Sequence, residues 1–362
     1  DDLGLMEDYL GVLAETGTSW HHCPGNHDVD WDSLGNSQAF ETWKRHRGPT
    51  HYAFQHGHAT FILLNNVEYS GRHGTEYAGR RYRGVIGANQ LRFVRNVLSH
   101  VPLNHLIVLS MHIPLVSFDN PESPSDTTAD RDELLALLAG RPHTVSFSGH
   151  SHTTEHHYLD AGPQSIEPHH HHVLTAICGS WWGGPKTASG RPVADSRDGS
   201  PRGYHVLSVD GHRYETRFYP SESAAPAVMR VAAVAGTESL GLNSLSVQIA
   251  ALSGIPVPVS GRRLVVDVFD GGPRTRVTCE FEGIAHPPQE MARTVIADPH
   301  VVDSFKAHRE SWKPWVSPAV SSHIWTAPLP LELVPGRHPV VVRAVGEYGT
   351  TEEHRTEVVI EA

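Results

Sequence analysis

Three short clusters of side chains that could bind metal or transfer protons stand out in the sequence. They are Gly25-Asn26-His27-Asp28, the single His112, and Gly149-His150-Ser151-His152. Imidazole nitrogen and amide oxygen suit zinc, iron, nickel or manganese. The rings of His150 and His152, two residues apart on an extended loop, can diverge toward two ions about 4 Å apart, the usual two-metal spacing. The clusters therefore predict a transition-metal site.

Each cluster follows a stretch that is predicted to be a strand. These stretches are Ser19 to Cys23, Leu106 to Leu109 and Thr144 to Phe147. Loops at the carboxyl ends of strands in an open α/β sheet converge on one crevice, so residues far apart in sequence can meet there. One cluster alone is more typical of a turn, a surface loop or a buried histidine than of a metal site. All three together, each after a strand, favour the metal site.

Alternating helices and buried strands predict an α/β fold for the first part of the chain. Apolar residues at helical spacing from Leu3 to Leu13 predict a helix that stops at Gly17. Asp130 and Glu133 form a capping-box pattern before another predicted helix. The remaining predictions are a strand at Phe61 to Leu64, a helix at Leu91 to Leu98 and a strand at Val173 to Ile177.

The texture of the sequence changes after Pro220, which predicts a domain of residues 1–220 and a second of residues 221–362. Alternating residues at 264–269 and 277–281, separated by Gly271-Gly272, predict a β-hairpin. Two more strands are predicted at 340–345 and 356–360. The C-terminal part is therefore predicted to be a small all-β sandwich.

Composition excludes several classes of protein. The 362 residues suit two domains, and the net charge of −11 without a basic stripe argues against a nucleic-acid binder. No apolar run reaches the roughly 18 residues that a membrane span needs. The three cysteines are far apart and form no CxxC pair, which argues against a zinc ribbon or a disulfide scaffold. Oligomeric state is left open.

The three clusters resemble, in order, the last three of the five motifs of the calcineurin-like metallophosphoesterases: GNH[DE], a lone His, and GHxH. Other stretches resemble a bacterial branch of that family, which carries a C-terminal β domain. They are Tyr69 to Arg72, Leu109 to Leu115, Cys178 to Trp182, Asp198 to Tyr204, Asp298 to Glu310 and Ser321 to Pro330.

The resemblance implies a fold and an activity. The fold is α/β, a metallophosphoesterase-type β-sandwich flanked by helices (αββα), followed by the small all-β sandwich. The activity is hydrolysis of phosphomonoesters or phosphodiesters with two divalent metal ions (Mn, Fe, Zn or Ni) and a bridging hydroxide that attacks phosphorus. The substrate is a small-molecule, glycan-linked or lipid-linked phosphoester, and the expected location is periplasmic or secreted.

The resemblance also implies roles for single residues. Asn26, His112 and His150 would bind the second metal ion, and His152 the first. His27 would stabilise charge on the phosphate or protonate the leaving oxygen. Asp28 would hold the His27 ring in place and favour its protonated form.

The first two family motifs, DxH and GDxxD, are not found ahead of the first cluster in the sequence. They are expected before the helix that starts at Leu3, so the first domain is expected to lack its first strand or strands. Asp1 or Asp2 could be the end of the second motif. We therefore expect this chain to bind the first metal weakly and to be weakly active or inactive, while the full-length protein is an enzyme. A truncated or degraded metal-binding scaffold and an extracellular binding module are the alternatives.

Other residues have two interpretations each. Arg72 could pair with a phosphate oxygen or be a solvated loop residue, and Trp181 and Trp182 could form a substrate platform or a packing pair. The His169 to His172 run is interpreted as a polar loop, with one ring lining the crevice as the alternative. The loop that holds Glu122, Ser123, Asp126 and Asp130 is interpreted as a flexible rim and not as a ligand set. Trp312, Trp315 and Trp325 are interpreted as packing residues, with glycan or partner binding as the alternative.

Overall fold

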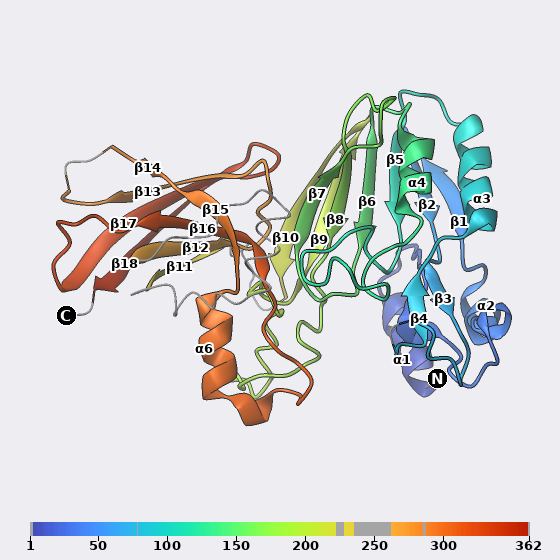
Figure 1. Cartoon of the computed structure of the whole chain (residues 1–362), viewed down its shortest axis with the longest axis horizontal. Coiled ribbons are helices and arrows are strands. Elements are labelled where there is room, and N and C mark those ends of the chain that lie inside the picture. Colours follow the sequence, from blue (N-terminus) through green and yellow to red (C-terminus); the bar gives the residue numbers. More distant parts are fainter. Residues whose placement is uncertain (1–2, 78, 222–227, 235–261, 285–286, 361–362) are drawn as a thin grey trace. The chain divides into compact units, whose positions relative to one another are not determined.

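The computed structural model describes residues 3–77, 79–221, 228–234, 262–284 and 287–360 (Figure 1). Asp1, Asp2 and most of residues 221–260 lie outside the described residues. Two compact units divide the chain. Unit 1 holds residues 1–150, 158–171 and 209–213, and unit 2 holds residues 151–157, 172–208 and 214–362. The predicted domain boundary after residue 220 stays a prediction.

A six-stranded sheet with the order β1-β2-β5-β6-β8-β7 forms the base of unit 1. Its strands are β1 (Tyr52–His56), β2 (Ala59–Leu63), β5 (Leu106–Ser110), β6 (Thr144–Ser148), β7 (Glu155–Leu159) and β8 (His169–Val173). β7 and β8 contribute residues to both units. β2, β5 and β6 run parallel, so their carboxyl ends lie at one edge of the sheet. The loops that follow these three strands carry Asn66, His112 and His150.

Two amphipathic helices pack on this sheet (Figure 1). They are α3 (Ala88–Ser99) and α4 (Arg131–Leu138), both close to the predicted positions. Their leucines and valines share one core with β2 and β5. The predicted capping box at α4 is wrong, because Asp130 makes no side-chain bond to its own helix. Its carboxylate instead accepts hydrogen bonds from the backbone N–H groups of Ile86 and Gly87.

The segment before the first cluster holds one confirmed and one wrong prediction. α1 (Leu3–Glu15) is confirmed, and Gly17 adopts a φ of 67° after it. The strand predicted at Ser19 to Cys23 is wrong, since these residues join no sheet. The backbone of His22 instead bonds the Tyr52 hydroxyl, which accepts from the His22 N–H at 2.9 Å and donates to the His22 carbonyl oxygen at 3.3 Å.

A second, smaller core of unit 1 lies under the first cluster. It combines Val29, Phe40, Trp43, Tyr69 and Tyr82 with other buried side chains. The elements around it are the 3₁₀ turns η1 (Asn26–Asp28) and η2 (Asn36–Gln38), helix α2 (Glu41–Arg47), and the paired strands β3 (Val67–Tyr69) and β4 (Tyr82–Gly84).

The histidine run at 169–172 is the fully buried strand β8, so its interpretation as a polar loop is wrong. The strand predicted at Val173 to Ile177 is wrong, because β8 ends at Val173. The hydroxyl of Ser146 lies 2.7 Å from both His169 and His171. His171 also accepts a hydrogen bond from the backbone N–H of Leu115. Hydrogen bonding of this kind makes buried imidazoles tolerable in a sheet interior.

Unit 2 contains two four-stranded antiparallel sheets that share one hydrophobic core (Figure 1). The first has the order β11-β12-β16-β15 and the second β14-β13-β17-β18. The strands are β11 (Met229–Val234), β12 (Arg263–Val268), β13 (Arg276–Phe281), β14 (Gln289–Glu290), β15 (Ala292–Ile296), β16 (Ser321–Pro328), β17 (Gly336–Val345) and β18 (Thr351–Ile360). β9 (Gly203–Asp210) and β10 (Arg213–Pro220) form a separate pair that contributes to both units.

The hairpin predicted between β12 and β13 is wrong, because the two strands belong to different sheets. Gly271 and Gly272 let the chain cross between the sheets at close range. A Cβ at Gly271 would lie 2.6 Å from the Trp325 ring, and one at Gly272 would lie 2.6 Å from the Cβ of His156. Sequence alternation identified both strands but not their partners.

Helix α6 (Pro299–Ala307) and the turn η4 (Arg309–Ser311) lie between β15 and β16. Asp298 caps α6 by accepting from the backbone N–H of His300 at 2.9 Å, and Pro299 occupies the first helical position. The Trp312 ring stacks on Phe305.

The predicted fold class is confirmed: a mixed α/β region with a central sheet and helices precedes all-β sheets. Among the described residues, no helix is long and apolar enough to cross a membrane.

Candidate metal centre

Three predicted metal ligands of unit 1 converge at the carboxyl edge of its sheet. The Nε2 atom of His112 lies 2.8 Å from Oδ1 of Asn26 and 3.1 Å from Nδ1 of His150. The two imidazole rings meet edge to face, with centroids 4.9 Å apart. An amide oxygen and two imidazole nitrogens therefore face one another across hydrogen-bonding distances.

Gly25 gives His112 the room that this arrangement needs. A Cβ at position 25 would lie 2.8 Å from Nδ1 of His112, closer than side chains tolerate. The Asp28 carboxylate accepts from the backbone N–H of Gly25 at 2.8 Å and so closes the turn that presents Asn26. The first cluster is thus a compact 3₁₀ turn that places both Gly25 and Asn26 against His112.

Asn66 positions the loop that carries His112. Its Oδ1 accepts from the backbone N–H groups of His112 (3.2 Å) and Ile113 (3.0 Å). Its Nδ2 donates to the Ile113 carbonyl and to the Thr128 hydroxyl. Asn66 is fully buried. Asn66 was not predicted as a site residue, although it follows the predicted strand at Phe61 to Leu64 just as the three clusters follow predicted strands.

Asp126 lies behind His150, on the side away from His112. Its Oδ1 is 3.4 Å from Nε2 of His150, and its Oδ2 accepts from the Ser123 hydroxyl at 2.5 Å. Burial would raise the pKa of this carboxyl, but the hydrogen bonds from His150 and Ser123 lower it overall. A carboxylate that accepts the Nε2 proton leaves Nδ1 of His150 as the basic nitrogen, as in many metal sites. Asp126 therefore has defined partners beside the site and is not simply part of a rim.

Backbone strain coincides with predicted site residues. Among the described residues, five other than glycine have positive φ: His150, His152, Trp181, Trp182 and Ala194. Such conformations cost free energy and tend to cluster at functional sites. Four of these five were singled out from sequence.

His152 belongs to unit 2, and its ring orientation is set there. Its Nδ1 donates to the Gly179 carbonyl oxygen, and the ring stacks on Trp181 with centroids 3.9 Å apart. A ring that donates from Nδ1 carries its lone pair on Nε2. The surroundings of His152 thus favour the tautomer that binds metal through Nε2.

His27 and Asp28 line a cavity of about 630 Å³ in unit 1, together with Cys23, Trp43 and Arg47. The His27 side chain is exposed. Burial, the largest cause, raises the pKa of Asp28 despite the N–H of Gly25 and the nearby charge of Arg47. In the part of the chain that the structure describes, the Asp28 hydrogen bond goes to Gly25 and not to the His27 ring.

The residues predicted to contact substrate have other neighbours. Arg72 is exposed, and its Nε lies 3.0 Å from His73. Trp181 packs edge to face on Trp315, with centroids 4.7 Å apart. Trp182 is half exposed beneath the guanidinium of Arg202, which lies 4.8 Å from its ring. Their role toward substrate stays a prediction.

Comparison with known proteins bears on the family. The family described as "C terminal of Calcineurin-like phosphoesterase" matches residues 171–351, half of the chain. The chain belongs to the calcineurin-like phosphoesterases. The resemblance inferred from the sequence is therefore confirmed at the level of the family. Its bacterial origin stays a prediction.

The family match and the three clusters occupy different parts of this calcineurin-like phosphoesterase. The match includes Trp181, Trp182 and strands β11 to β17, whereas Asn26, His112 and His150 lie before it. The family is thus established by residues other than the motifs that first indicated it.

The purple acid phosphatase PPD1 from yellow lupin (Lupinus luteus) seeds is similar in structure, with a TM-score of 0.35 and 15% sequence identity. The similarity covers 54% of this chain and 38% of that one. No curated protein sequence matches the chain.

Proposed function

We propose that this calcineurin-like phosphoesterase hydrolyses phosphoric esters at a metal centre held by Asn26, His112 and His150. The observation that supports this most strongly is the approach of Asn26 Oδ1 and His150 Nδ1 to the same nitrogen of His112, at 2.8 and 3.1 Å. Membership of the family supports the reaction class.

The three side chains fit a divalent metal ion chemically. Asn26 offers only a lone pair through Oδ1, and His150 offers one through Nδ1 when Asp126 holds its Nε2 proton. A single proton on His112 Nε2 cannot serve both acceptors well. Three convergent lone pairs are the arrangement that a zinc-type or manganese-type cation satisfies.

When bound, a divalent ion would polarise a phosphoryl oxygen and make water acidic enough to attack near neutral pH. The protein side chains have their own tasks. Asn66 holds the His112 loop through two backbone hydrogen bonds, and Asp126 sets the His150 tautomer. His27, exposed at a cavity, would protonate the leaving oxygen or stabilise charge on the phosphate.

The finer parts of the proposal concern the second ion and the substrate. His152 would bind the first ion of a dinuclear centre through Nε2, a role that the Nδ1 bond to Gly179 supports. The substrate would be a phosphomonoester or phosphodiester, small or linked to a glycan or lipid, met outside the cytoplasm. Turnover by the 362-residue chain would be low, since neither DxH nor GDxxD precedes Gly25 in its sequence.

Hydrolysis of p-nitrophenyl phosphate and bis(p-nitrophenyl) phosphate tests the proposal. The chain is stripped of metal and assayed before and after addition of Mn²⁺ or Zn²⁺. We expect turnover only with metal, and a loss of about 100-fold or more in His27→Ala, which is the usual scale for a general acid. His46→Ala, an exposed histidine of α2, serves as the matched control and should leave turnover unchanged.

Two results would contradict this function. One is turnover that is the same with and without metal. The other is a His27→Ala variant as active as the parent chain, which would remove His27 from the mechanism while leaving the metal site to be tested separately.

A further inference from the structure

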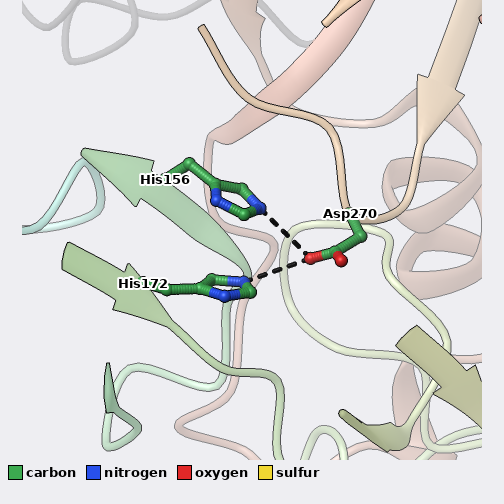
Figure 2. Close-up of side chains that lie close together, drawn as sticks. All are labelled: His156, His172 and Asp270. Carbon is green, nitrogen blue, oxygen red and sulfur yellow. Dashed lines mark hydrogen bonds and ion pairs between the residues drawn. The ribbon is translucent and has the colours of Figure 1, made fainter. Parts of the chain in front are cut away.

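A second group of histidines lies in unit 2 and includes none of the residues assigned to the proposed catalytic centre. The Nε2 atoms of His156, His172 and His205 lie 3.2, 3.1 and 3.0 Å from the same oxygen, Oδ1 of Asp270. Figure 2 shows the His156 and His172 rings side by side on neighbouring strands, both directed at the carboxylate. Their centroids are 3.9 Å apart, and His205 meets His172 edge to face at 4.9 Å.

The three rings come from three strands, β7, β8 and β9, and are almost completely buried. Side chains alternate between the faces of a strand. His169 and His171 therefore point to one face of β8 and bond Ser146, while His172 points to the other face and reaches Asp270. The four-histidine run thus serves two different environments.

The loop that supplies Asp270 is held in place independently of the histidines. Oε1 of Glu347 accepts from the backbone N–H groups of Arg274 and Thr275 at 2.8 and 3.0 Å. Gly272 has no side chain to keep the loop away from His156. Asp270 is consequently fixed in front of the rings, and the site is organised before any ligand arrives.

Hydrogen bonding alone does not satisfy this group well. Three Nε2–H groups would have to share one carboxylate oxygen, which has only two lone pairs. A metal ion resolves the conflict, because it accepts lone pairs from the nitrogens and from the oxygen together. Metal–nitrogen bonds of about 2.0 to 2.1 Å place tetrahedral ligands about 3.3 Å apart, which is close to the 3.0 to 3.2 Å between each Nε2 atom and the Asp270 oxygen.

Among the described residues, His156, His172 and Asp270 form the one group of three His, Cys, Asp or Glu side chains whose ligand atoms all lie within 4.8 Å of one another. We propose that these three residues bind a zinc-type divalent ion in unit 2, with His205 as the fourth ligand. A closed set of four protein ligands is typical of structural zinc. The ion would join β7, β8 and β9 to the loop between β12 and β13.

An entry path exists beside Asp270. Its side chain is 18% exposed and lines a cavity of about 140 Å³ with Phe218, Glu347 and Tyr348. A hydrated ion could reach the carboxylate from this side, whereas the rings are covered.

Metal counting on the full chain tests the proposal. All samples carry His112→Ala, which removes a ligand of the proposed catalytic centre, and are equilibrated with Zn²⁺ and then desalted. We expect one tightly held zinc per chain. Adding Asp270→Asn should abolish it, and adding His157→Gln should not. His157 is the matched control because it neighbours His156 but bonds Glu155.

Thermal unfolding provides an independent reading. Zinc should raise the unfolding midpoint by several degrees in the His112→Ala chain and in the His157→Gln control, but not with Asp270→Asn, since a ligand that binds only the folded state stabilises it. If the Asp270→Asn chain does not fold, zinc X-ray absorption of the His112→Ala chain decides the question. A shell of imidazole nitrogens would support the site.

Zinc content that is unaffected by Asp270→Asn would overturn the proposal. So would a folded His112→Ala chain that holds no zinc at all, which would show that the rings and the carboxylate are only hydrogen-bonded. Neither result bears on the esterase proposal, whose readout is turnover.

Discussion

Two groups of histidines in this chain are built in opposite ways. In the unit 1 group, Asn26 lies in a 3₁₀ turn, His112 and His150 lie on loops after parallel strands, and His150 has a strained backbone with a φ of 73°. The His156, His172 and Asp270 group of unit 2 takes its rings from regular strands, and none of its residues has a positive φ. The unit 1 group thus contains backbone strain that the unit 2 group lacks.

Each group includes a carboxyl whose pKa is lowered by histidines. Burial would raise the pKa of Asp270, but His205 and His172 lower it well below its usual value. Burial and the neighbouring His156 lower the pKa of His172 to about 3. The pKa of Asp126 in unit 1 is also lowered, by His150 and Ser123 against its burial. The two groups therefore differ in backbone geometry and not in the direction of the carboxyl pKa.

The largest expected effect comes from His112→Ala. Removing the nitrogen that both Asn26 and His150 approach should lower metal-dependent turnover by about 1,000-fold, which is at most about 4 kcal/mol of transition-state stabilisation. Folding should persist, as measured by circular dichroism. His100→Ala, at the exposed end of α3, is the control. A His112→Ala chain that retains its activity would contradict the catalytic role of the unit 1 group.

The next effect is on stability. Asn66→Ala leaves the buried backbone N–H groups of His112 and Ile113 without their acceptor, so we expect a loss of about 2 to 4 kcal/mol in the free energy of unfolding. Urea unfolding measures it, and the exposed Asn89→Ala is the control. A loss no greater than that of the control would mean that Asn66 does not hold the His112 loop.

Asp126→Asn should act through His150 and not directly. We expect metal affinity at the unit 1 group to fall by about 10- to 100-fold, the usual consequence of losing a carboxylate behind a ligating histidine. Excess metal should then restore most of the turnover, which would not happen if Asp126 were a catalytic base. Titration of activity with Mn²⁺ separates the two cases.

The smallest effect is on pH dependence. The pKa of Asp126 is lowered on folding, so its stabilisation is present above the unfolded pKa and is lost as pH falls through the folded value. The pKa of Asp28 is raised, so its contribution has the opposite sign and is lost as pH rises. Acid unfolding curves of Asp126→Asn and Asp28→Asn should therefore shift in opposite directions, and shifts in the same direction would contradict both assignments.

Much of the fold follows from local pattern. The α3 and α4 helices and strands β2, β5, β6, β12, β13, β17 and β18 are close to their predicted positions because apolar spacing reports burial. Pairing does not follow, since alternation says which face of β12 is buried but not that its neighbours are β11 and β16. Four consecutive histidines were interpreted as a loop because the hydroxyl partner that makes burial possible, Ser146, lies more than twenty residues away.

Part of the candidate site could likewise be predicted from the sequence, and part could not. Asn26, His112 and His150 were identified because each follows a predicted strand, and the structure brings these three together although the strand predicted before Asn26 does not form. Asn66 and Asp126 act through backbone and ring hydrogen bonds that have no sequence motif. His156, His172 and Asp270 are separated by up to 114 residues, and their meeting depends on the crossing between two sheets at Gly271-Gly272.

Anomalous diffraction from crystals of the chain soaked in Mn²⁺ tests the central claim most directly. We expect an anomalous peak within bonding distance of Asn26 Oδ1, His112 Nε2 and His150 Nδ1. We also expect this peak to disappear in Asn26→Ala. Saturating Mn²⁺ with no peak at these three atoms, in crystals that hydrolyse p-nitrophenyl phosphate, would contradict it.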